Sequence, residues 1–454
     1  MSHRFPTTTG VLARAVMEYA RHQPEETLLY EVIDEYYPEF LSHLSASDKT
    51  LPQYVQNEFE AYLKCGRLEH GFLRVQCESC PHEQLVAFSC KRRGFCPSCG
   101  AKRMVESAAL LVDSVLPRQS IRQWVLSVPF PLRWLFASEP RILSKALGVV
   151  TRAIGTYLVK KAGFTHATAK TGAVTLIQRF GSALNLNIHF HMLFLDGVYE
   201  VDSAGGAGKF HTIETPTSDE MQRLLQRISE RIARLLEREG YLERDSEEGS
   251  LLLDGFEDDV INHLQGSSVT YRIAVGSHRG KKVFTLKTLA ARDDEEINGQ
   301  TLAKSGGFSL HAGVSATSHQ RDKVERLCRY IARPAVSTHR MERLADGKIS
   351  YELKTPYKNG TTHVIFEPLD FIARLSALVP KPRHHLTRFH GVFAPNSKHR
   401  ATVTGEAKEK QAQSTATEPS ADCEERRGKM NWAMRLKRVF NIDITICRHC
   451  QGSG

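Results

Sequence analysis

The chain has 454 residues, of which 41% are hydrophobic and 25% are charged, and its formal net charge at pH 7 is +10. This composition is typical of a globular protein with room for two or three domains, and it excludes an intrinsically disordered chain. The sequence shows neither an apolar run of membrane length nor a secretory signal, so we expect a cytoplasmic protein with no membrane partner.

The N-terminal segment, residues 1–64, is predicted to be helical, because residues 24–44 carry apolar side chains at helical spacing. Residues 65–105 then hold six of the ten cysteines. In a chain without an export signal, cysteines at this density indicate metal binding rather than disulfide bonds.

Two C-x-x-C motifs, Cys77 to Cys80 and Cys96 to Cys99, have the spacing of a zinc ribbon. Each motif directs two thiolates at one point, and two motifs complete the tetrahedron that Zn²⁺ prefers. The sequence therefore predicts a structural Zn²⁺ site in a zinc-binding domain at residues 65–105. Four more candidate ligands could complete a second site or replace one ribbon ligand: Cys65, His70, His82 and Cys90.

Basic residues lie beside these cysteines, where Lys91, Arg92 and Arg93 form a run that fits a polyanionic partner. A basic C-terminal segment, residues 430–454, ends in a lone C-x-x-C motif, Cys447 to Cys450. Its two thiolates are only half of the four ligands that a closed zinc site needs. We expect it to borrow ligands such as His449 or Cys423.

Residues 118–395 are predicted to form a mixed domain of strands and helices. The expected strands are residues 123–130, 172–180, 184–197, 271–276, 283–289, 308–316, 349–355 and 362–368, the last two joined by a turn at 357–360. The expected helices are residues 141–163, a capped helix that begins at Thr217 and ends at Gly240, and residues 318–333, which Pro334 ends. Residues 396–429 are polar and are predicted to be a linker.

The strand at residues 184–197 has one polar and one apolar face, because successive side chains alternate. Asn185, Asn187, His189 and His191 share the polar face. Two imidazoles at positions i and i+2 project in parallel, about 6 to 7 Å apart, and can hold one metal ion between them. An exposed strand with two ordinary histidines would give the same pattern.

The helix at residues 318–333 places Tyr330 at the edge of its buried stripe, on the same side as Lys323, Arg326 and Arg333. A tyrosine has an unperturbed pKa of about 10 and needs positive charge or a polarised phosphate nearby to act as a nucleophile. The alternative reading is a half-buried structural tyrosine.

Several stretches, in this order, make the chain resemble rolling-circle HUH transposases of the IS91 and common-region (ISCR) insertion-sequence families. They are FLRVQCESC with FSCKRRGFCPSC, QWVLSVPFPLRW, NIHFHMLFLDGVY, RLCRYIARP and LKTPYKNGTTHVIFEPLDFIARL. They cover most of residues 60–395, and NWAMRLKRVFNIDI is similar to the family's C-terminal segment. The resemblance implies an α+β fold, an HUH-type palm with an antiparallel sheet, preceded by a helical segment and a zinc-ribbon-like domain.

The resemblance also implies a chemistry. His189 and His191 would bind Mg²⁺ or Mn²⁺, with His311 or Gln320 as a third ligand, and Tyr330 would attack a phosphodiester to give a 5′-phosphotyrosine. Arg326 stands where some relatives carry a second tyrosine, which implies the single-tyrosine type. The expected partners are single-stranded DNA at element ends and target DNA, at the nucleoid. The DNA contacts would come from Lys91, Arg92, Arg93, Arg326 and Arg333.

Other functions remain open from the sequence. An HUH replication initiator or relaxase shares the chemistry but acts at an origin. A non-catalytic zinc-ribbon DNA-binding regulator would make the histidine pair incidental, and a small-molecule metallohydrolase would leave Tyr330 and the cysteines without a role. Because the family commonly continues past the final C-x-x-C, a truncated product is a further reading.

Overall fold

The structure is a computed structural model, and it describes residues 21–202, 206–243, 250–251, 259–289, 301–404, 434, 437–439, 446–447, 449–450 and 452. The chain divides into two compact units. The larger unit comprises Pro24–Cys65 and Ser89–Thr415, and the smaller unit comprises Met1–Gln23, Gly66–Phe88 and Ala416–Gly454. The first twenty residues of the predicted helical segment lie outside the described residues.

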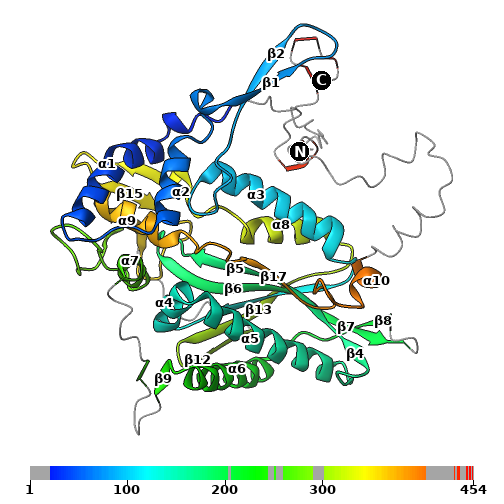
Figure 1. Cartoon of the computed structure of the whole chain (residues 1–454). Helices are drawn as coiled ribbons and strands as arrows, with labels where there is room; N and C mark the ends of the chain where they lie inside the picture. The colour runs from blue at the N-terminus through cyan, green and yellow to red at the C-terminus, as the bar shows by residue number, and fades with distance from the viewer. Residues whose placement is uncertain are drawn as a thin grey trace, which may run out of the picture. The chain divides into compact units, whose positions relative to one another are not determined.

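The larger unit is built on a six-stranded antiparallel sheet (Figure 1). Its strands, in spatial order, are β12 (Leu302–Ser305), β13 (Phe308–Ala316), β3 (Ile121–Ser127), β6 (Leu186–Leu195), β5 (Gly172–Phe180) and β17 (Thr387–Gly391). The strand that carries the two histidines, β6, is therefore central, with β3 and β5 as its neighbours.

Helices cover both faces of this sheet, because successive side chains of a strand point to opposite faces and each face packs into its own apolar cluster. Phe190 and Met192 of β6 point into the larger core, which they share with several helices. Leu193 and Leu195 point to the other face and a second core. The helices of the larger core are α1 (Leu28–Ser45), α2 (Gln53–Leu63), α4 (Phe130–Ser138), α5 (Pro140–Lys161), α6 (Ser218–Arg238), α7 (Val260–Val269) and α9 (Pro368–Leu378). The second core contains α3 (Pro97–Leu110), the π-helical turn η3 (Leu111–Val115), α8 (Arg321–Ile331) and α10 (Arg400–Thr404).

Smaller sheets complete the two units. The larger unit has a four-stranded sheet in the order β11 (Phe284–Lys287), β16 (Thr361–Phe366), β15 (Ile349–Glu352) and β14 (Met341–Arg343). It also has a three-stranded sheet in the order β4 (Ala169–Lys170), β7 (Gly197–Val201) and β8 (Ala207–Thr212). A third, two-stranded sheet pairs β9 (Leu242–Glu243) with β10 (Ser250–Leu251). The short 3₁₀ turns of the larger unit are η1 (Pro24–Glu26) and η5 (Thr338–Arg340). In the smaller unit, η2 (Leu68–His70) precedes the antiparallel hairpin of β1 (Phe72–Gln76) and β2 (Glu83–Ala87).

The helix α5 is the one helix in the described part of the chain that is long and apolar enough to cross a membrane. Most of its apolar window is buried inside the protein. The same test is passed by the core helix of a protein that never enters a membrane, so this feature is weak evidence for a span.

Most predicted elements are present, and α6 begins with the predicted capping box of Thr217 and Glu220. Three segments differ. The strand predicted to reach Phe130 ends at Ser127, because α4 starts after Pro129. Residues 271–276 make one isolated bridge instead of a strand, since Tyr271 has a left-handed φ of 58° that interrupts the extended backbone. The predicted linker begins later than residue 396, because α10 packs Val403 into the second core, and residues 405–433 lie outside the described residues.

Candidate active site and zinc sites

The two histidines of β6 lie side by side on the face of the sheet that also carries α8. Their ring centroids are 4.8 Å apart. His189 is opposite Ser127 on β3 and Gln178 on β5, and His191 is opposite Val125 and Leu176. The predicted alternation is confirmed, since Phe190 and Met192 are fully buried on the other face.

The Nδ1 atom of each ring is engaged by a hydrogen bond, which leaves Nε2 as the candidate metal ligand. The Nδ1 atom of His189 lies 2.8 Å from the carbonyl oxygen of Asn187. A carbonyl only accepts, so Nδ1 carries the proton and Nε2 keeps its lone pair. The Nδ1 atom of His191 lies 2.8 Å from the side-chain amide of Gln123, and its Nε2 is buried without a partner in the structure. The Gln123 atom nearest to this Nδ1 is the amide nitrogen, which donates to it. Exchanging the amide nitrogen and oxygen lets Nδ1 donate instead, and that tautomer keeps a free lone pair on Nε2.

Both imidazoles are held neutral. Burial, together with the positive charges of Arg133 and Arg333, lowers the pKa of His189 to about 4, against the opposing effect of the hydrogen bond to Asn187. Burial also lowers the pKa of His191 to about 3, with contributions from His189 and Arg333. Neutral imidazole is the form that binds a metal ion, so the donor set fits a divalent cation.

Tyr330 lies on the last turn of α8 with its side chain 45% exposed, so the phenol is accessible to a substrate. The helix packs through Val324, Cys328 and Ile331 into the second core. Two cations lie over the tyrosine ring: the guanidinium of Arg333 is 4.6 Å from its centroid and the ammonium of Lys354 is 4.2 Å from it.

Of these two cations, only Arg333 was expected. Lys354 follows β15, far along the sequence, and no local pattern in the sequence could have revealed it. Arg326 is exposed one helical turn before Tyr330.

A hydrogen bond and a charge link the segment around Tyr330 to the histidine pair. Gln178, which faces His189 across the ladder, donates from its side-chain Nε2 to the carbonyl oxygen of Ile331 over 3.1 Å. Arg333, which stacks on Tyr330, lowers the pKa of both histidines through its charge. The charge of Arg333 therefore acts on both Tyr330 and the histidine pair.

The two predicted third ligands lie on other elements, His311 on β13 and Gln320 at the N-terminal end of α8. His311 on β13 is in the same row as His191, but Val125 of β3 separates them, which places their backbones about 10 Å apart. Gln320 accepts a hydrogen bond from the backbone of Thr317. Within the described ranges, the sets of three or more clustered His, Cys, Asp or Glu ligands are made of cysteines alone.

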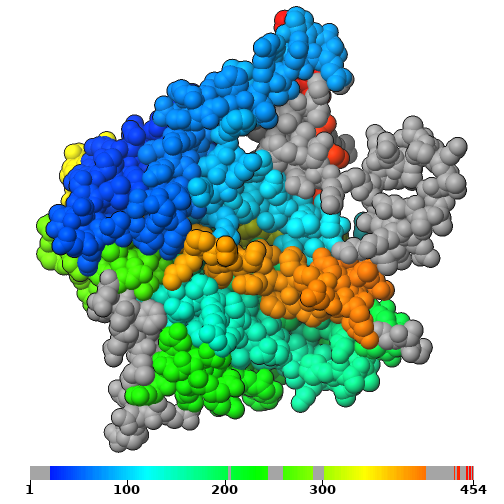
Figure 2. All heavy atoms as spheres, in the orientation of Figure 1, coloured from blue at the N-terminus to red at the C-terminus, as the bar shows by residue number. Residues whose placement is uncertain are grey.

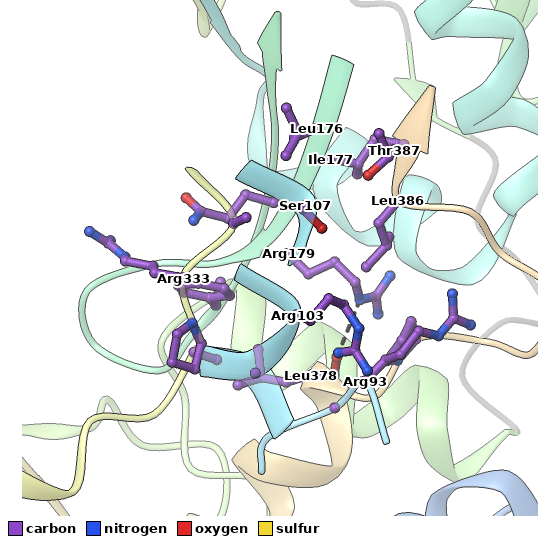
Figure 3. Close-up of a pocket in the computed structure, with 18 of the residues that line it drawn as sticks. Arg93, Arg103, Ser107, Leu176, Ile177, Arg179, Arg333, Leu378, Leu386 and Thr387 are labelled. Carbon is purple, nitrogen blue, oxygen red and sulfur yellow. Dashed lines mark hydrogen bonds between the residues drawn. The ribbon is translucent and has the colours of Figure 1, made fainter. Parts of the chain in front are cut away.

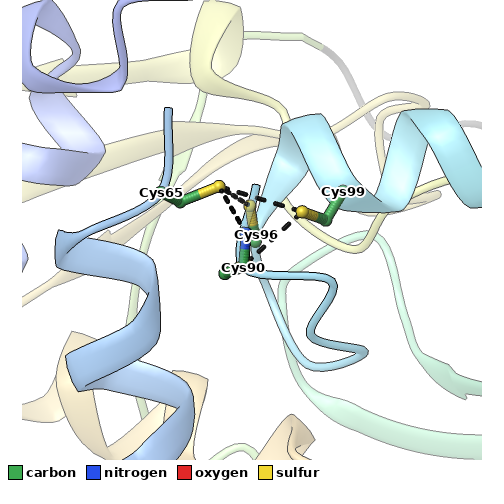
Figure 4. A group of neighbouring side chains, drawn as sticks. All are labelled: Cys65, Cys90, Cys96 and Cys99. Carbon is green, nitrogen blue, oxygen red and sulfur yellow. Dashed lines mark hydrogen bonds between the residues drawn. The ribbon is translucent and has the colours of Figure 1, made fainter. Parts of the chain in front are cut away.

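The cysteines form two tetrads, and their pairing differs from the predicted ribbon. The first tetrad, in the larger unit, is Cys65, Cys90, Cys96 and Cys99 (Figure 4). Cys65 Sγ is 3.8 Å from the sulfurs of both Cys96 and Cys99, and Cys90 Sγ is 3.4 Å from that of Cys99. Four sulfurs at about 2.3 Å from a tetrahedral ion lie about 3.8 Å from one another, so this tetrad fits Zn²⁺.

The second tetrad, in the smaller unit, joins Cys77 and Cys80 to Cys447 and Cys450. The distances from Cys77 Sγ to Cys450 Sγ and from Cys80 Sγ to Cys447 Sγ are both 3.7 Å, which again fits Zn²⁺. One sulfur of each motif accepts a backbone N–H from two residues further along the chain: Cys77 from Ser79, and Cys450 from Gly452.

The lone C-terminal motif is therefore completed by a distant hairpin, not by His449. That imidazole stacks on His82 instead. The other proposed partner, Cys423, lies outside the described residues.

The predicted basic run lies between Cys90 and Cys96 of the first tetrad. Arg93 donates from Nη1 to the carbonyl oxygen of His384 over 2.7 Å, and Lys91 has a left-handed φ of 54° at the start of the turn. Arg92 and Arg93 both line a pocket that reaches the segment after Tyr330, together with Arg333.

Comparison with known families identifies two regions. The Y2_Tnp family model, described as "Putative transposase", matches residues 172–401, just over half of the chain, and spans His189, His191 and Tyr330. The Zn_Tnp_IS91 model, a transposase zinc-binding domain, matches residues 32–128, which include the first tetrad but not Cys447 or Cys450. No curated protein and no solved structure matches the chain. The chain belongs to the IS91-type transposases, a family of DNA-processing enzymes.

Proposed function

We propose that this transposase nicks and rejoins single-stranded DNA at the ends of an insertion sequence, through a covalent bond between Tyr330 and a 5′ phosphate. The observation that carries the proposal is the position of Arg333. Its guanidinium lies 4.6 Å from the Tyr330 ring and lowers the pKa of both histidines. A phosphate bound there would meet the nucleophile, a cation and the histidine pair together. The proposed setting is the cytoplasm, at the nucleoid.

The chemistry divides between these groups. The Tyr330 oxygen forms the new bond to phosphorus, the bond to the 3′ oxygen breaks, and the phenol proton passes to solvent while the 3′ oxygen gains one. Arg333 and Lys354, which lie over the tyrosine ring, would bind the phosphate oxygens. A divalent ion held by the Nε2 atoms of His189 and His191 would polarise the phosphate. The phosphotyrosine bond retains the energy of the broken diester, so rejoining needs no ATP.

The test uses a single-stranded oligonucleotide from the element end, labelled at its 3′ end and incubated with the protein and Mg²⁺ or Mn²⁺. The wild-type protein is expected to give a labelled protein band on a denaturing gel. Tyr330→Phe and His189→Ala are expected to lower the rate of its appearance at least 100-fold, the scale on which catalytic groups act.

Tyr36→Phe is the matched control, because Arg343 stacks on that ring as well, at 5.8 Å, but on α1. An adduct that persists in Tyr330→Phe, or that disappears equally in Tyr36→Phe, contradicts the assignment. A wild-type protein that binds the oligonucleotide without cutting it favours a non-catalytic DNA-binding role instead.

A further inference from the structure

A pocket of about 280 Å³ lies in the larger unit beside the tyrosine helix (Figure 3). Its walls come from the first turns of α3, the end of β5, residues 331–335 after the tyrosine, and the approach to β17. The segment of β17 and α10 crosses the surface next to α3, which is visible in Figure 2. The pocket is therefore bounded by the first cysteine tetrad on one side and by the nucleophile's helix on the other.

The pocket is strongly basic. Five arginines line it, and none of the lining residues is an aspartate or glutamate. Figure 3 shows the side chains of Arg93, Arg103 and Arg179 gathered on one side, while Arg333 lies apart from them. Guanidinium groups gathered in a cavity without a carboxylate indicate an anionic ligand, and their planar donors suit a phosphate.

Arg179 is the deepest of these cations, with only 4% of its surface exposed. It donates only to the backbone carbonyls of Leu378 and Ala377, over 3.3 and 3.5 Å, which carry no formal charge. Burial lowers the pKa of Arg179 to about 10. A charge held in this way is stabilised by any anion that reaches it.

One carboxylate does lie near this group. Glu58 accepts the backbone N–H groups of Arg93 and Gly94, and so it is engaged with the loop rather than with the guanidinium groups. Burial raises the pKa of Glu58, against the hydrogen bonds that lower it. Both carboxylate oxygens of Glu58 are thus engaged by the loop that carries Arg93.

Apolar side chains form the remaining wall of the pocket: Leu176, Ile177, Phe180, Pro334, Leu378 and Leu386. A cavity with cations on one side and apolar groups on the other matches a nucleotide, which has a charged phosphate and a flat base. The volume is at the lower end of the range for small-ligand sites, roughly 300 Å³, which limits the occupant to about one nucleotide.

The location also defines which nucleotide could enter. Arg333 and Pro334 follow Tyr330 by three and four residues and line the pocket. Gly100 of α3 packs so closely on Pro334 that an added Cβ would lie 2.7 Å from the Cβ of that proline. The helix of the first tetrad and the segment after the nucleophile therefore form one continuous wall.

We infer that this pocket binds one nucleotide of the DNA strand next to the phosphate that Tyr330 attacks, with the arginines on its phosphate and the apolar wall on its base. The inference rests on the proposed nicking function for the position of the strand. It assigns the arginines of the zinc-binding region to substrate positioning, in addition to general attraction of DNA.

The experiment measures DNA affinity by fluorescence anisotropy in a Tyr330→Phe background, where no strand is cut. Methylphosphonate groups, which remove one negative charge each, replace the phosphates of the oligonucleotide one at a time. We expect one replacement next to the cut site to weaken binding about tenfold, as for a charge-assisted hydrogen bond. The same replacement should have less than a twofold effect in Arg179→Gln and in Arg92→Gln.

Arg231→Gln on the exposed face of α6 is the matched control, and it should keep the full tenfold effect. Arg92 is only half-buried, so Arg92→Gln remains informative if the buried Arg179→Gln variant fails to fold. Equal losses at every phosphate, or the same loss in wild-type and Arg92→Gln proteins, would overturn the inference. Because binding is measured without cutting, failure of Tyr330 to form an adduct is a separate result.

Discussion

At the scale of single residues, the environment of each histidine decides its role more than its motif does. The Nδ1 atoms of His189 and His191 are engaged by the Asn187 carbonyl and the Gln123 amide, which leaves their Nε2 atoms as the candidate ligands of the proposed metal ion. His384 is buried as well, but both of its ring nitrogens lack a partner in the structure. It lies among cations near the inferred nucleotide pocket, so its protonation should be unfavourable in the folded protein.

This environment predicts a pH dependence of stability. Burial lowers the pKa of His384 from 6.5 to about 4, and the charges of Arg179, Arg388 and Arg93 contribute. Above pH 6.5 the residue is neutral in both states and contributes nothing. Between pH 6.5 and 4 the unfolded chain binds a proton that the folded chain does not. The free energy of unfolding should therefore decrease as the pH falls from 6.5 to 4, by about 3 kcal/mol from this group.

Urea unfolding of wild-type and His384→Gln proteins at several pH values measures this contribution. The variant should lose less stability than the wild type between pH 6.5 and 4. His339→Gln, an exchange at a histidine in the surface turn η5, serves as the control. Parallel pH curves for the wild type and His384→Gln would show that His384 titrates normally.

At the scale of elements, the β5–β6 ladder and α8 are connected by the bond from Gln178 to the Ile331 carbonyl. The bond is buried and lies at the C-terminal end of the helix, where carbonyl groups have no partner within the helix. Gln178→Leu leaves that carbonyl without its donor. It should reduce the free energy of unfolding by about 1–3 kcal/mol.

A positioning role predicts more than this loss of stability. With saturating DNA, Gln178→Leu should form the covalent adduct at least tenfold more slowly, because small displacements of the proposed nucleophile are costly. Gln222→Leu removes a similar bond, from α6 to the carbonyl of Lys304, and is the control. If the two variants slow adduct formation equally, Gln178 has only a structural role.

The secondary-structure elements also show which parts of the fold and of the candidate site the sequence could predict. The alternation in β6 and the buried stripe of α8 follow from local periods of two and 3.6 residues, so both elements were predicted. Cross-strand partners depend on register between distant segments, so the sequence could not show that Gln178 and Gln123 neighbour the histidine pair or that β3 lies between His311 and β6. Lys354 reaches Tyr330 from another sheet and carries no local signal.

At the scale of the whole molecule, the predicted zinc-binding segment is divided between two units. The C-x-x-C rule indicates which cysteines bind zinc, but it does not say which motifs share an ion, because that depends on tertiary proximity. The Cys96 motif is completed by Cys65 and Cys90 within the larger unit. The Cys77 motif is completed by the C-terminal motif within the smaller unit.

This pairing makes a quantitative prediction about zinc content. The purified protein should contain about two Zn²⁺ per chain by mass spectrometry of metals, since a closed four-thiolate site binds one ion. Cys80→Ser combined with Cys447→Ser should leave one Zn²⁺, because both residues belong to the same tetrad. Cys80→Ser combined with Cys96→Ser should leave none, because each substitution opens a different tetrad.

A ribbon made of the first two C-x-x-C motifs would reverse this order, since Cys80 and Cys96 would then share an ion. Stability separates the two tetrads further. Cys65, Cys96 and Cys99 belong to the main core, so Cys96→Ser alone should lower the melting temperature of the larger unit. Cys80→Ser alone should leave that transition unchanged, because its tetrad lies in the smaller unit. Loss of both ions in Cys80→Ser alone would show that the two sites are not independent.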